Sequence, residues 1–190
     1  MSAVRELAVE RVEHLDPHDL ADLCDATNAA IVDGGGFGWL EAQSRAALER
    51  HFGGILLVPE REFFIARLDG EVVGSAQMIR PPRHNEAQAF SAQLAHAFIA
   101  PYARGFGLAR MLVRRVEDRA AALGMRVMNL DVRATQESAI ALFEAAGYTR
   151  WGVHPAYARA NGQTIPGYYY YKLLEVPGGR STAEALGDIG

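Results

Sequence analysis

Short apolar stretches alternate with polar residues along much of the chain, and this pattern predicts the strands of a sheet. The clearest pair spans residues 63–68 and 72–79, joined by Asp69-Gly70, a dipeptide typical of tight hairpin turns. Further strands are predicted over 6–12, 93–99, 127–132 and 168–173, and one more begins at Tyr148. Apolar residues occupy alternate positions of 127–132, so one face of that strand is predicted to be buried.

Helical periodicity and capping residues predict four helices. The first begins at Asp16-Pro17, because Asp is a favoured N-cap and proline suits the first helical position. The other three are predicted over 39–51 with an end at Gly53-Gly54, after Gly107 as far as Gly124, and up to Gly147. Residues 154–167 contain two prolines and two glycines and are predicted to form a long loop.

Composition and charge narrow the class of protein. The chain has 190 residues, of which 49% are hydrophobic and 22% charged, as in ordinary globular domains. Its net charge of −4 argues against a general nucleic-acid binder, which needs a basic surface. A single cysteine, Cys24, excludes an intrachain disulfide framework, and no apolar run reaches the length of a membrane span. With no signal-peptide pattern at the N-terminus, we expect a cytoplasmic protein with no membrane partner.

The stretch 99–110 joins the end of a predicted strand to the start of a predicted helix. Gly105 and Gly107 allow a tight turn and a close approach of the backbone to a ligand. The N-terminus of the following helix presents free N–H groups and a positive dipole end, which suit a phosphate or pyrophosphate. Arg104 and Arg110 add two positive charges at the same place.

Three phosphate-binding patterns compete for this loop. The dinucleotide pattern G-x-G-x-x-G is nearly present, and Asp131 is placed as its acidic residue, but Arg110 occupies the third glycine position. The pattern G-x-x-x-x-G-K-[ST] is absent from the chain. The third pattern, [QR]-x-x-G-x-[GA], is matched at every fixed position by residues 104–109.

A second segment, residues 131–148, lies one strand and one helix further along the chain. It reads DVRATQESAIALFEAAGY, and it resembles the second signature of the GNAT acyltransferases, just as 104–109 resembles their coenzyme A loop. The two signatures occur in the family's order and spacing and together cover about 94–148. The chain is therefore identified, by resemblance, as a member of the GNAT superfamily.

The resemblance implies an α/β (α+β) fold with a mixed, mostly antiparallel sheet of about 6–7 strands. The sheet would be splayed at the coenzyme site and carry helices on both faces. With no internal repeat or linker in view, we expect a single domain over 1–175 and a loose tail over 176–190. The implied reaction is direct transfer of an acetyl group from acetyl-CoA to a primary amine. The alternative is a regulatory domain that binds acyl-CoA without catalysis.

Candidate catalytic residues follow from the same resemblance. Asp131 matches the position at which some members carry a glutamate base, although it could equally pair with Arg133 or cap a turn. His96, on the strand before the coenzyme loop, is a second candidate base. The tyrosine that protonates the departing thiolate in many members is replaced by Phe143, which cannot donate a proton. Tyr148 is the first replacement candidate, followed by Tyr157 and the run 168–171.

Coenzyme contacts are expected mainly from the backbone. The strand residues Ala97, Phe98 and Ile99 should pair with the pantetheine arm, and a backbone N–H in this strand should stabilise the oxyanion. The loop residues expected at the pyrophosphate are Arg104, Gly105, Phe106, Gly107, Leu108, Ala109 and Arg110. Gln136 replaces the family's usual asparagine near the pantetheine. No metal is expected, and the partners are a small-molecule or peptide amine, with homodimer formation left open.

Overall fold

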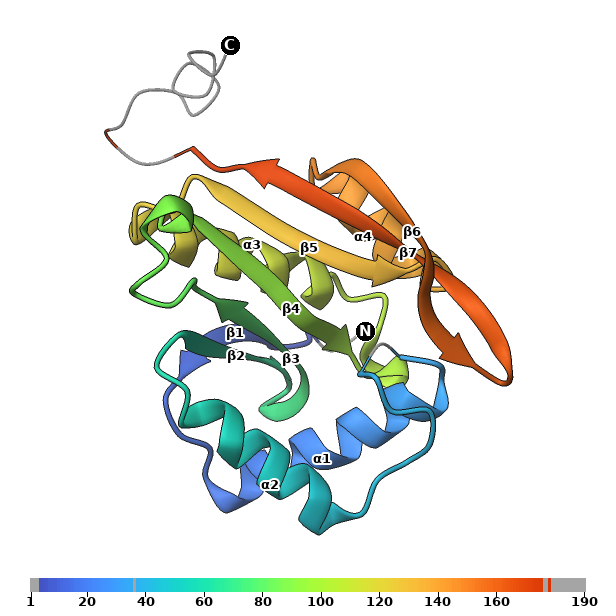
Figure 1. Cartoon of the computed structure of the whole chain (residues 1–190). Helices are drawn as coiled ribbons and strands as arrows, with labels where there is room; N and C mark the ends of the chain where they lie inside the picture. The colour runs from blue at the N-terminus through green and yellow to red at the C-terminus, as the bar shows by residue number, and fades with distance from the viewer. Residues whose placement is uncertain (1–3, 36, 176–177, 179–190) are drawn as a thin grey trace. The chain divides into compact units, whose positions relative to one another are not determined.

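The structure is a computed structural model, and it describes residues 4–35, 37–175 and 178. The chain forms two compact units, each built from two separate segments. The first unit lies within residues 1–77 and 96–115, and the second within 78–95 and 116–190. Figure 1 labels the helices and strands along the chain. Strand β4 and helix α3 each contribute residues to both units.

The described residues form a mixed sheet of seven strands in the order β1-β2-β3-β4-β5-β7-β6. The strands are β1 (Leu7–Val12), β2 (Arg61–Leu68), β3 (Glu71–Ile79), β4 (Ser91–Ile99), β5 (Val127–Arg133), β6 (Thr149–Ala160) and β7 (Gln163–Leu173). The pairs β1–β2, β5–β7 and β6–β7 are antiparallel, and β4–β5 is parallel. The predicted fold class, with a mostly antiparallel mixed sheet of 6–7 strands, is confirmed, while the splay at the coenzyme site stays a prediction.

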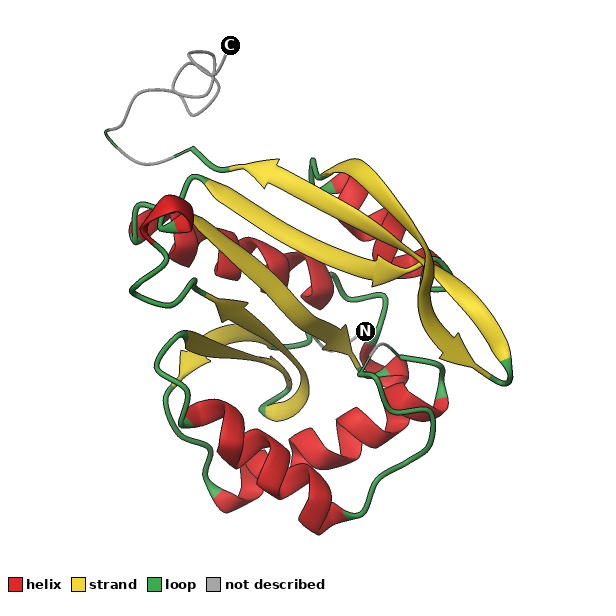
Figure 2. Ribbon diagram, viewed as in Figure 1, coloured by secondary structure: helices red, strands yellow, loops and turns green. Residues whose placement is uncertain are grey.

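The helices are α1 (Pro17–Val32), α2 (Arg45–Leu56), α3 (Leu108–Ala122) and α4 (Glu137–Ala145), with short 3-10 turns η1 (Glu86–Gln88) and η2 (Pro101–Ala103). Helix α1 begins as predicted, since the Asp16 carboxylate accepts hydrogen bonds from the backbone N–H groups of His18 and Asp19, both at 2.8 Å. Helices α1 and α2 lie side by side in the first unit (Figure 2). Their buried residues pack with β2 and β3 in one core cluster, Leu23, Cys24, Leu48, Phe52, Ile55, Phe63, Ile65 and Val72.

Helix α2 differs from the prediction at both ends. It begins after Ser44, whose hydroxyl accepts from the Ala47 N–H at 3.3 Å, and it continues through Gly53 and Gly54 to Leu56. Phe52 and Ile55 are both buried, and burying them on one helical face requires the turn that contains the two glycines. Packing therefore overrides the weak helix propensity of glycine here.

The loop predicted over 154–167 is wrong. These residues form the outer parts of β6 and β7, which meet at Asn161 and Gly162, with φ of 51° and 76°. Two consecutive residues with positive φ are the signature of a two-residue hairpin turn. The strand predicted over 168–173 is part of β7, which pairs with both β5 and β6, so β6 is the last strand in the sheet order.

Two predictions of chain organisation remain. The single domain over 1–175 stays a prediction, since the structure describes two units. The tail predicted over 176–190 lies outside the described residues, apart from Gly178. Among the helices that the structure describes, none is long and apolar enough to cross a membrane.

Candidate active site

The coenzyme loop of the sequence analysis lies in the first unit, between the end of β4 and the start of α3. Gly105 and Gly107 both have φ of 88°, a backbone conformation that residues with a Cβ rarely adopt. A Cβ built at either position meets no heavy atom within 4 Å. Backbone conformation, and not crowding within the protein, therefore requires glycine here, and the space next to both residues is open to a ligand.

Arg104 anchors this loop. Its guanidinium donates to the Asp33 carboxylate at 2.6 Å and to the carbonyl oxygen of Ile99 at 3.3 Å. Asp33 is the C-cap of α1, and both side chains of the pair are about half exposed. One Arg104 side chain thus ties the coenzyme loop to α1 and to the end of β4. Arg110, in the first turn of α3, is exposed.

Strand β4 is irregular just before the loop. His96 has φ of 51°, which is unusual for a strand residue other than glycine and marks a strained position of the kind found at functional sites. Gly74 on β3 makes room for the following residues, because a Cβ there would lie 2.3 Å from the Phe98 carbonyl oxygen and 2.6 Å from Ile99 Cδ1. Gly74 was not among the residues predicted from the sequence, although a glycine inside an apolar strand is a known sign of a close backbone approach.

One aromatic ring, that of Phe37, lies beside the candidate base His96 in the first unit. The Phe37 ring lies 6.2 Å from the His96 ring and 4.7 Å from that of Phe98. Trp39 contacts His51 of α2 edge-on at 4.9 Å. Burial, and then the neighbouring His96, lower the pKa of His51, so this second histidine is neutral at pH 7.

Asp131 lies on β5 in the second unit, where side chains from two other strands hold its carboxylate. Gln93 of β4 donates to Oδ1 at 3.1 Å, and the hydroxyl of Tyr157 of β6 donates to Oδ2. The parallel pairing of Ser91–Gln93 with Val127–Asn129 brings Gln93 close to Asp131. Burial and then the hydrogen bond to Asp131 raise the pKa of Tyr157, so its hydroxyl keeps its proton and acts as a donor.

Tyr148 and Phe143 form a buried pair in the second unit. Their rings pack edge to face with centroids 5.7 Å apart, and both residues are under 10% exposed. Lys172 lies over the Tyr148 ring at 5.6 Å and pairs with Glu117 at 2.7 Å. Burial, and next the charge of Glu117, raise the pKa of Tyr148, which makes it a weak acid. Its role as proton donor to the thiolate stays a prediction that this environment does not favour.

The remaining coenzyme candidates are distributed over both units. Ala97, Phe98 and Ile99 complete β4 in the first unit, directly before the loop. Gln136 is the N-cap residue of α4 in the second unit, and its backbone N–H donates to the Arg133 carbonyl oxygen at 3.0 Å.

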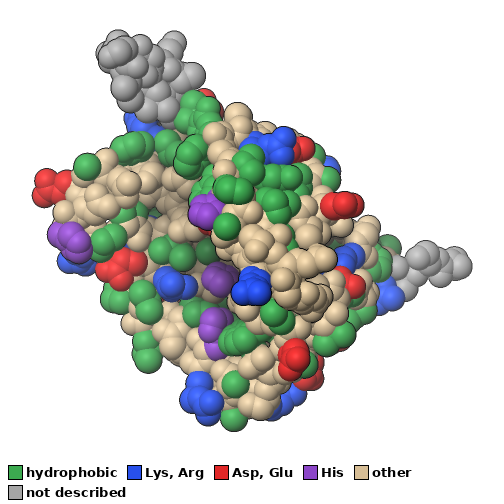
Figure 3. Space-filling view, turned by 45° about the vertical axis from the view of Figure 1, so that its right-hand side comes forward, with side chains coloured by type: hydrophobic (Ala, Val, Ile, Leu, Met, Phe, Trp, Pro, Cys, Tyr) green, Lys and Arg blue, Asp and Glu red, His purple; other side chains and the backbone are tan. Residues whose placement is uncertain are grey.

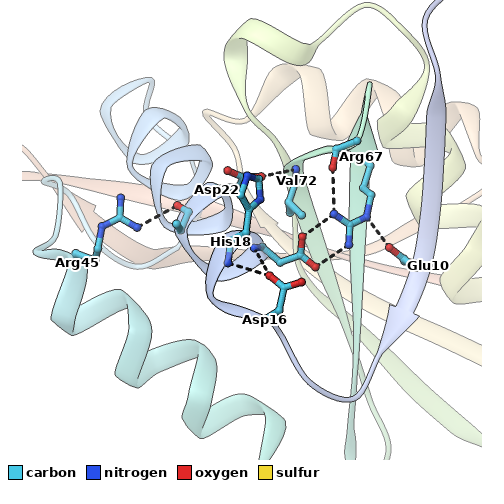
Figure 4. A network of polar contacts seen from close by, with 10 residues as sticks. Glu10, Asp16, His18, Asp22, Arg45, Arg67 and Val72 are labelled. Carbon is cyan, nitrogen blue, oxygen red and sulfur yellow. Dashed lines mark hydrogen bonds and ion pairs between the residues drawn. The ribbon is translucent and has the colours of Figure 1, made fainter.

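A cluster of His18, Asp19 and Asp22 on α1 has the residue types that bind metal ions (Figure 4). Both oxygens of Asp19 are already engaged by the Arg67 guanidinium, at 2.6 and 2.7 Å. Asp22 accepts from the backbone N–H of Val72 at 3.2 Å. A cation would have to displace Arg67, so the cluster is best described as an ion-pair network between α1 and β2.

Comparison with known proteins identifies the family. Residues 24–148 match the family model for the acetyltransferase (GNAT) family. The chain is 53% identical, over 131 residues, to a protein of Azospirillum brasilense named an uncharacterized N-acetyltransferase in the hisH-hisA intergenic region. That match covers 69% of this chain and 78% of the relative.

Solved structures of low sequence identity share the fold. A putative acetyltransferase of Salmonella typhimurium, yncA, solved with its cofactor acetyl-CoA, has a TM-score of 0.72 at 17% identity, covering 89% of this chain and 94% of its own. A GNAT superfamily phosphinothricin acetyltransferase of Sinorhizobium meliloti, in complex with acetyl-CoA, has a TM-score of 0.73 at 21% identity, covering 92% of each chain. The family match and the curated relative together show that the chain belongs to the GNAT family and is an acetyl-CoA-dependent acetyltransferase.

Proposed function

We propose that the enzyme transfers the acetyl group to a primary amine of a small molecule or a peptide, with Asp131 as the general base. The observation that carries this proposal is the carboxylate of Asp131, held at both oxygens by Gln93 and Tyr157. Both of these partners are hydrogen-bond donors, so the carboxylate is held in its ionised, proton-accepting form.

The chemistry requires a proton acceptor. An alkyl amine of pKa ~10 is mostly ammonium at neutral pH and must lose a proton before it attacks the thioester. Asp131 takes this first proton from the ammonium, directly or through a water. The neutral amine nitrogen then bonds to the acetyl carbon, the carbon–sulfur bond breaks, and coenzyme A leaves as the thiolate, which takes up the second proton that the nitrogen loses as the amide forms. A thiolate with a pKa near the ~8.5 of a cysteine thiol leaves without much help, which fits the absence of a donor at Phe143.

The coenzyme is assigned to the first-unit loop and the strand before it. Backbone N–H groups from Gly105 to Arg110 take the pyrophosphate, and the backbone of Ala97 to Ile99 pairs with the pantetheine arm, with Gln136 as a further contact. Two facts support this assignment: the positive φ of both loop glycines, and the open space beside each of them. Anion binding at the start of α3 follows from its dipole and unpaired N–H groups.

Replacement of Asp131 tests the proposal. Asp131→Asn keeps the size of the side chain and removes its basicity, so acetyl-CoA cleavage should slow by ~10²–10⁴ with the best acceptor of an amine panel. The panel holds an aliphatic diamine, free amino acids and a short peptide with a free N-terminus. His96→Asn is the matched variant, because Asn tolerates the positive φ at this position. Should His96→Asn be the slow variant and Asp131→Asn match the parent, the base is His96.

We also propose that the enzyme forms a homodimer through β6. This strand is last in the sheet order and is exposed along most of its length, including Trp151 at 65% and Val153 at 58%. Exposed apolar side chains on a long edge strand are a common basis for association. Light scattering after gel filtration should give twice the chain mass, and Trp151→Lys should give the monomer.

The cytoplasmic location remains a proposal, supported by the single, buried, free thiol of Cys24.

A further inference from the structure

A β-bulge interrupts β6 opposite the first part of β7. His154 pairs with Gly167, and the next pair is Ala158 with Ile165, so three residues of β6 face the single residue Pro166. Within the bulge, the Ala156 N–H donates to His154 Nδ1 at 3.1 Å. Bulges redirect side chains and occur often beside active sites. The side chain redirected here is Tyr157, the last residue of the bulge.

Gly167 provides the surface on which the Tyr157 ring rests. A Cβ at position 167 would lie 2.1 Å from Cγ, 2.4 Å from Cδ2 and 2.6 Å from Cβ of Tyr157. Such contacts are far shorter than any real Cβ tolerates, so Tyr157 occupies the space that a side chain at 167 would need. The Tyr169 ring meets the Tyr157 ring edge to face, with centroids 6.1 Å apart and planes at 84°. Glycine on one side and tyrosine on the other thus define the position of this ring.

The ring held in this way delivers its hydroxyl to Asp131. Tyr157 donates to Oδ2 and Gln93 donates to Oδ1, so each carboxylate oxygen carries one donor from the protein. An ionised carboxylate accepts about four hydrogen bonds. Two positions therefore remain for the ammonium group of an acceptor or for a water. The torsion at the end of an Asp side chain is broad, and the two donors restrict it.

We propose that Tyr157 is a positioning residue for the acetyl transfer, and that the β6 bulge and Gly167 place it so that Asp131 keeps one orientation. This inference rests on the proposed role of Asp131 as the base. It also gives Tyr157 a different role from that of proton donor to the thiolate, since its hydroxyl is directed at the carboxylate.

Tyr157→Phe tests the hydroxyl without disturbing the ring. We expect kcat for the best acceptor of the amine panel to fall about tenfold, while KM for acetyl-CoA stays within twofold. The groups that face Asp131 are Gln93 from β4, Tyr157 from β6 and its strand partner Tyr169 from β7, with Arg133 two residues along β5. Tyr169→Phe, which keeps the ring contact, should leave kcat unchanged.

A double-mutant cycle tests the role of Gly167. Gly167→Ala alone should reduce kcat at least as much as Tyr157→Phe, because the added methyl group displaces the ring. In a Tyr157→Ala background the same glycine change should have no further effect on kcat, since the obstructing ring is gone. Gly152→Ala is the matched control on β6, where a Cβ would make an ordinary 3.7 Å contact with Tyr169 Cβ.

The outcomes separate this inference from the proposed function. If Asp131→Asn is slow but Tyr157→Phe keeps the parent's kcat, Asp131 is the base and the positioning role is wrong. If Asp131→Asn has the parent's rate, the assignment of the base is wrong and the positioning role fails with it. Additive effects of Gly167→Ala and Tyr157→Ala would show that Gly167 acts by some route other than Tyr157. Thermal unfolding of each variant identifies any change that acts through folding alone.

Discussion

Asp19 of α1 and Arg67 of β2 form a two-pronged ion pair, which shows what one pair of side chains contributes to this fold. The Asp19 side chain is only 12% exposed, so Arg67, and not water, stabilises its negative charge. Asp19→Asn should lower the free energy of unfolding by about 1–3 kcal/mol at pH 7, measured by urea denaturation. Asp25→Asn on the same helix breaks an ion pair whose carboxylate is 70% exposed, and it should change stability little.

The Asp19–Arg67 pair should also make the free energy of unfolding depend on pH. The hydrogen bonds from Arg67 hold the pKa of Asp19 below its ordinary value, and burial opposes this only in part. The pair therefore stabilises the fold fully above the ~3.9 of an unfolded Asp, and this contribution is lost as pH falls through the lower, folded pKa. Between pH 5 and pH 3 the parent should lose more stability than Asp19→Asn. Equal losses in the two proteins would contradict the assignment.

Gly74 is the residue on which the shape of β4 depends. Gly74→Ala places a methyl group against the Phe98 carbonyl oxygen and the Ile99 side chain, at 2.3 and 2.6 Å. Because the first contact is with backbone, the strand itself must move, and we expect a loss of about 1–3 kcal/mol in the free energy of unfolding. Calorimetry should also show weaker acetyl-CoA binding, since Phe98 and Ile99 are assigned to the coenzyme.

At the scale of elements, α2 carries two glycines that its packing tolerates. Gly53 and Gly54 are exposed, and a Cβ at either position meets nothing within 4 Å. Gly53→Ala should therefore raise the free energy of unfolding by about 0.5–1 kcal/mol, because alanine loses less backbone entropy on entering a helix. Urea denaturation measures the change, and this variant is also the control for Gly74→Ala. A decrease in stability would mean that α2 does not continue through the glycines.

At the scale of the whole molecule, coenzyme binding should be visible as stabilisation. Acetyl-CoA at 100 times its Kd adds about 2.7 kcal/mol, which for a chain of this size raises Tm by about 5–10 °C. Gly107→Val should abolish the shift, because a branched side chain at a φ of 88° strains the loop and fills the space assigned to pyrophosphate. Gly124→Val, at a φ of 80° with nothing within 4 Å, is the matched control and should keep it. NAD should shift the Tm of neither protein.

The distribution of surface charge bears on whether the protein binds nucleic acid. On the face drawn in Figure 3, acidic and basic side chains are interspersed. A net charge of −4 distributed in this way does not provide the basic footprint that nucleic acids need. The charge pattern on this face therefore does not favour a nucleic-acid partner.

The sequence by itself determined the features that depend on neighbouring residues. The cap at Asp16, the turn at Asp69-Gly70 with φ of 52° and 89°, and the buried alternation of β5 all follow from local backbone and side-chain preferences. The coenzyme loop was recognised for the same reason, since its residues are consecutive. Family membership came from two such local segments.

Only the tertiary structure decided the features that depend on residues far apart in the chain. Gln93 and Tyr157 lie 38 and 26 positions from Asp131, yet both donate to its carboxylate. Packing and strand register likewise decide three other features. These are the left-handed backbone of His96, the close approach of β4 to Gly74, and the continuation of α2 through two glycines. Local propensities amount to a few tenths of a kcal/mol per residue, and the burial of Phe52 or the exclusion of a Cβ at Gly167 outweighs them.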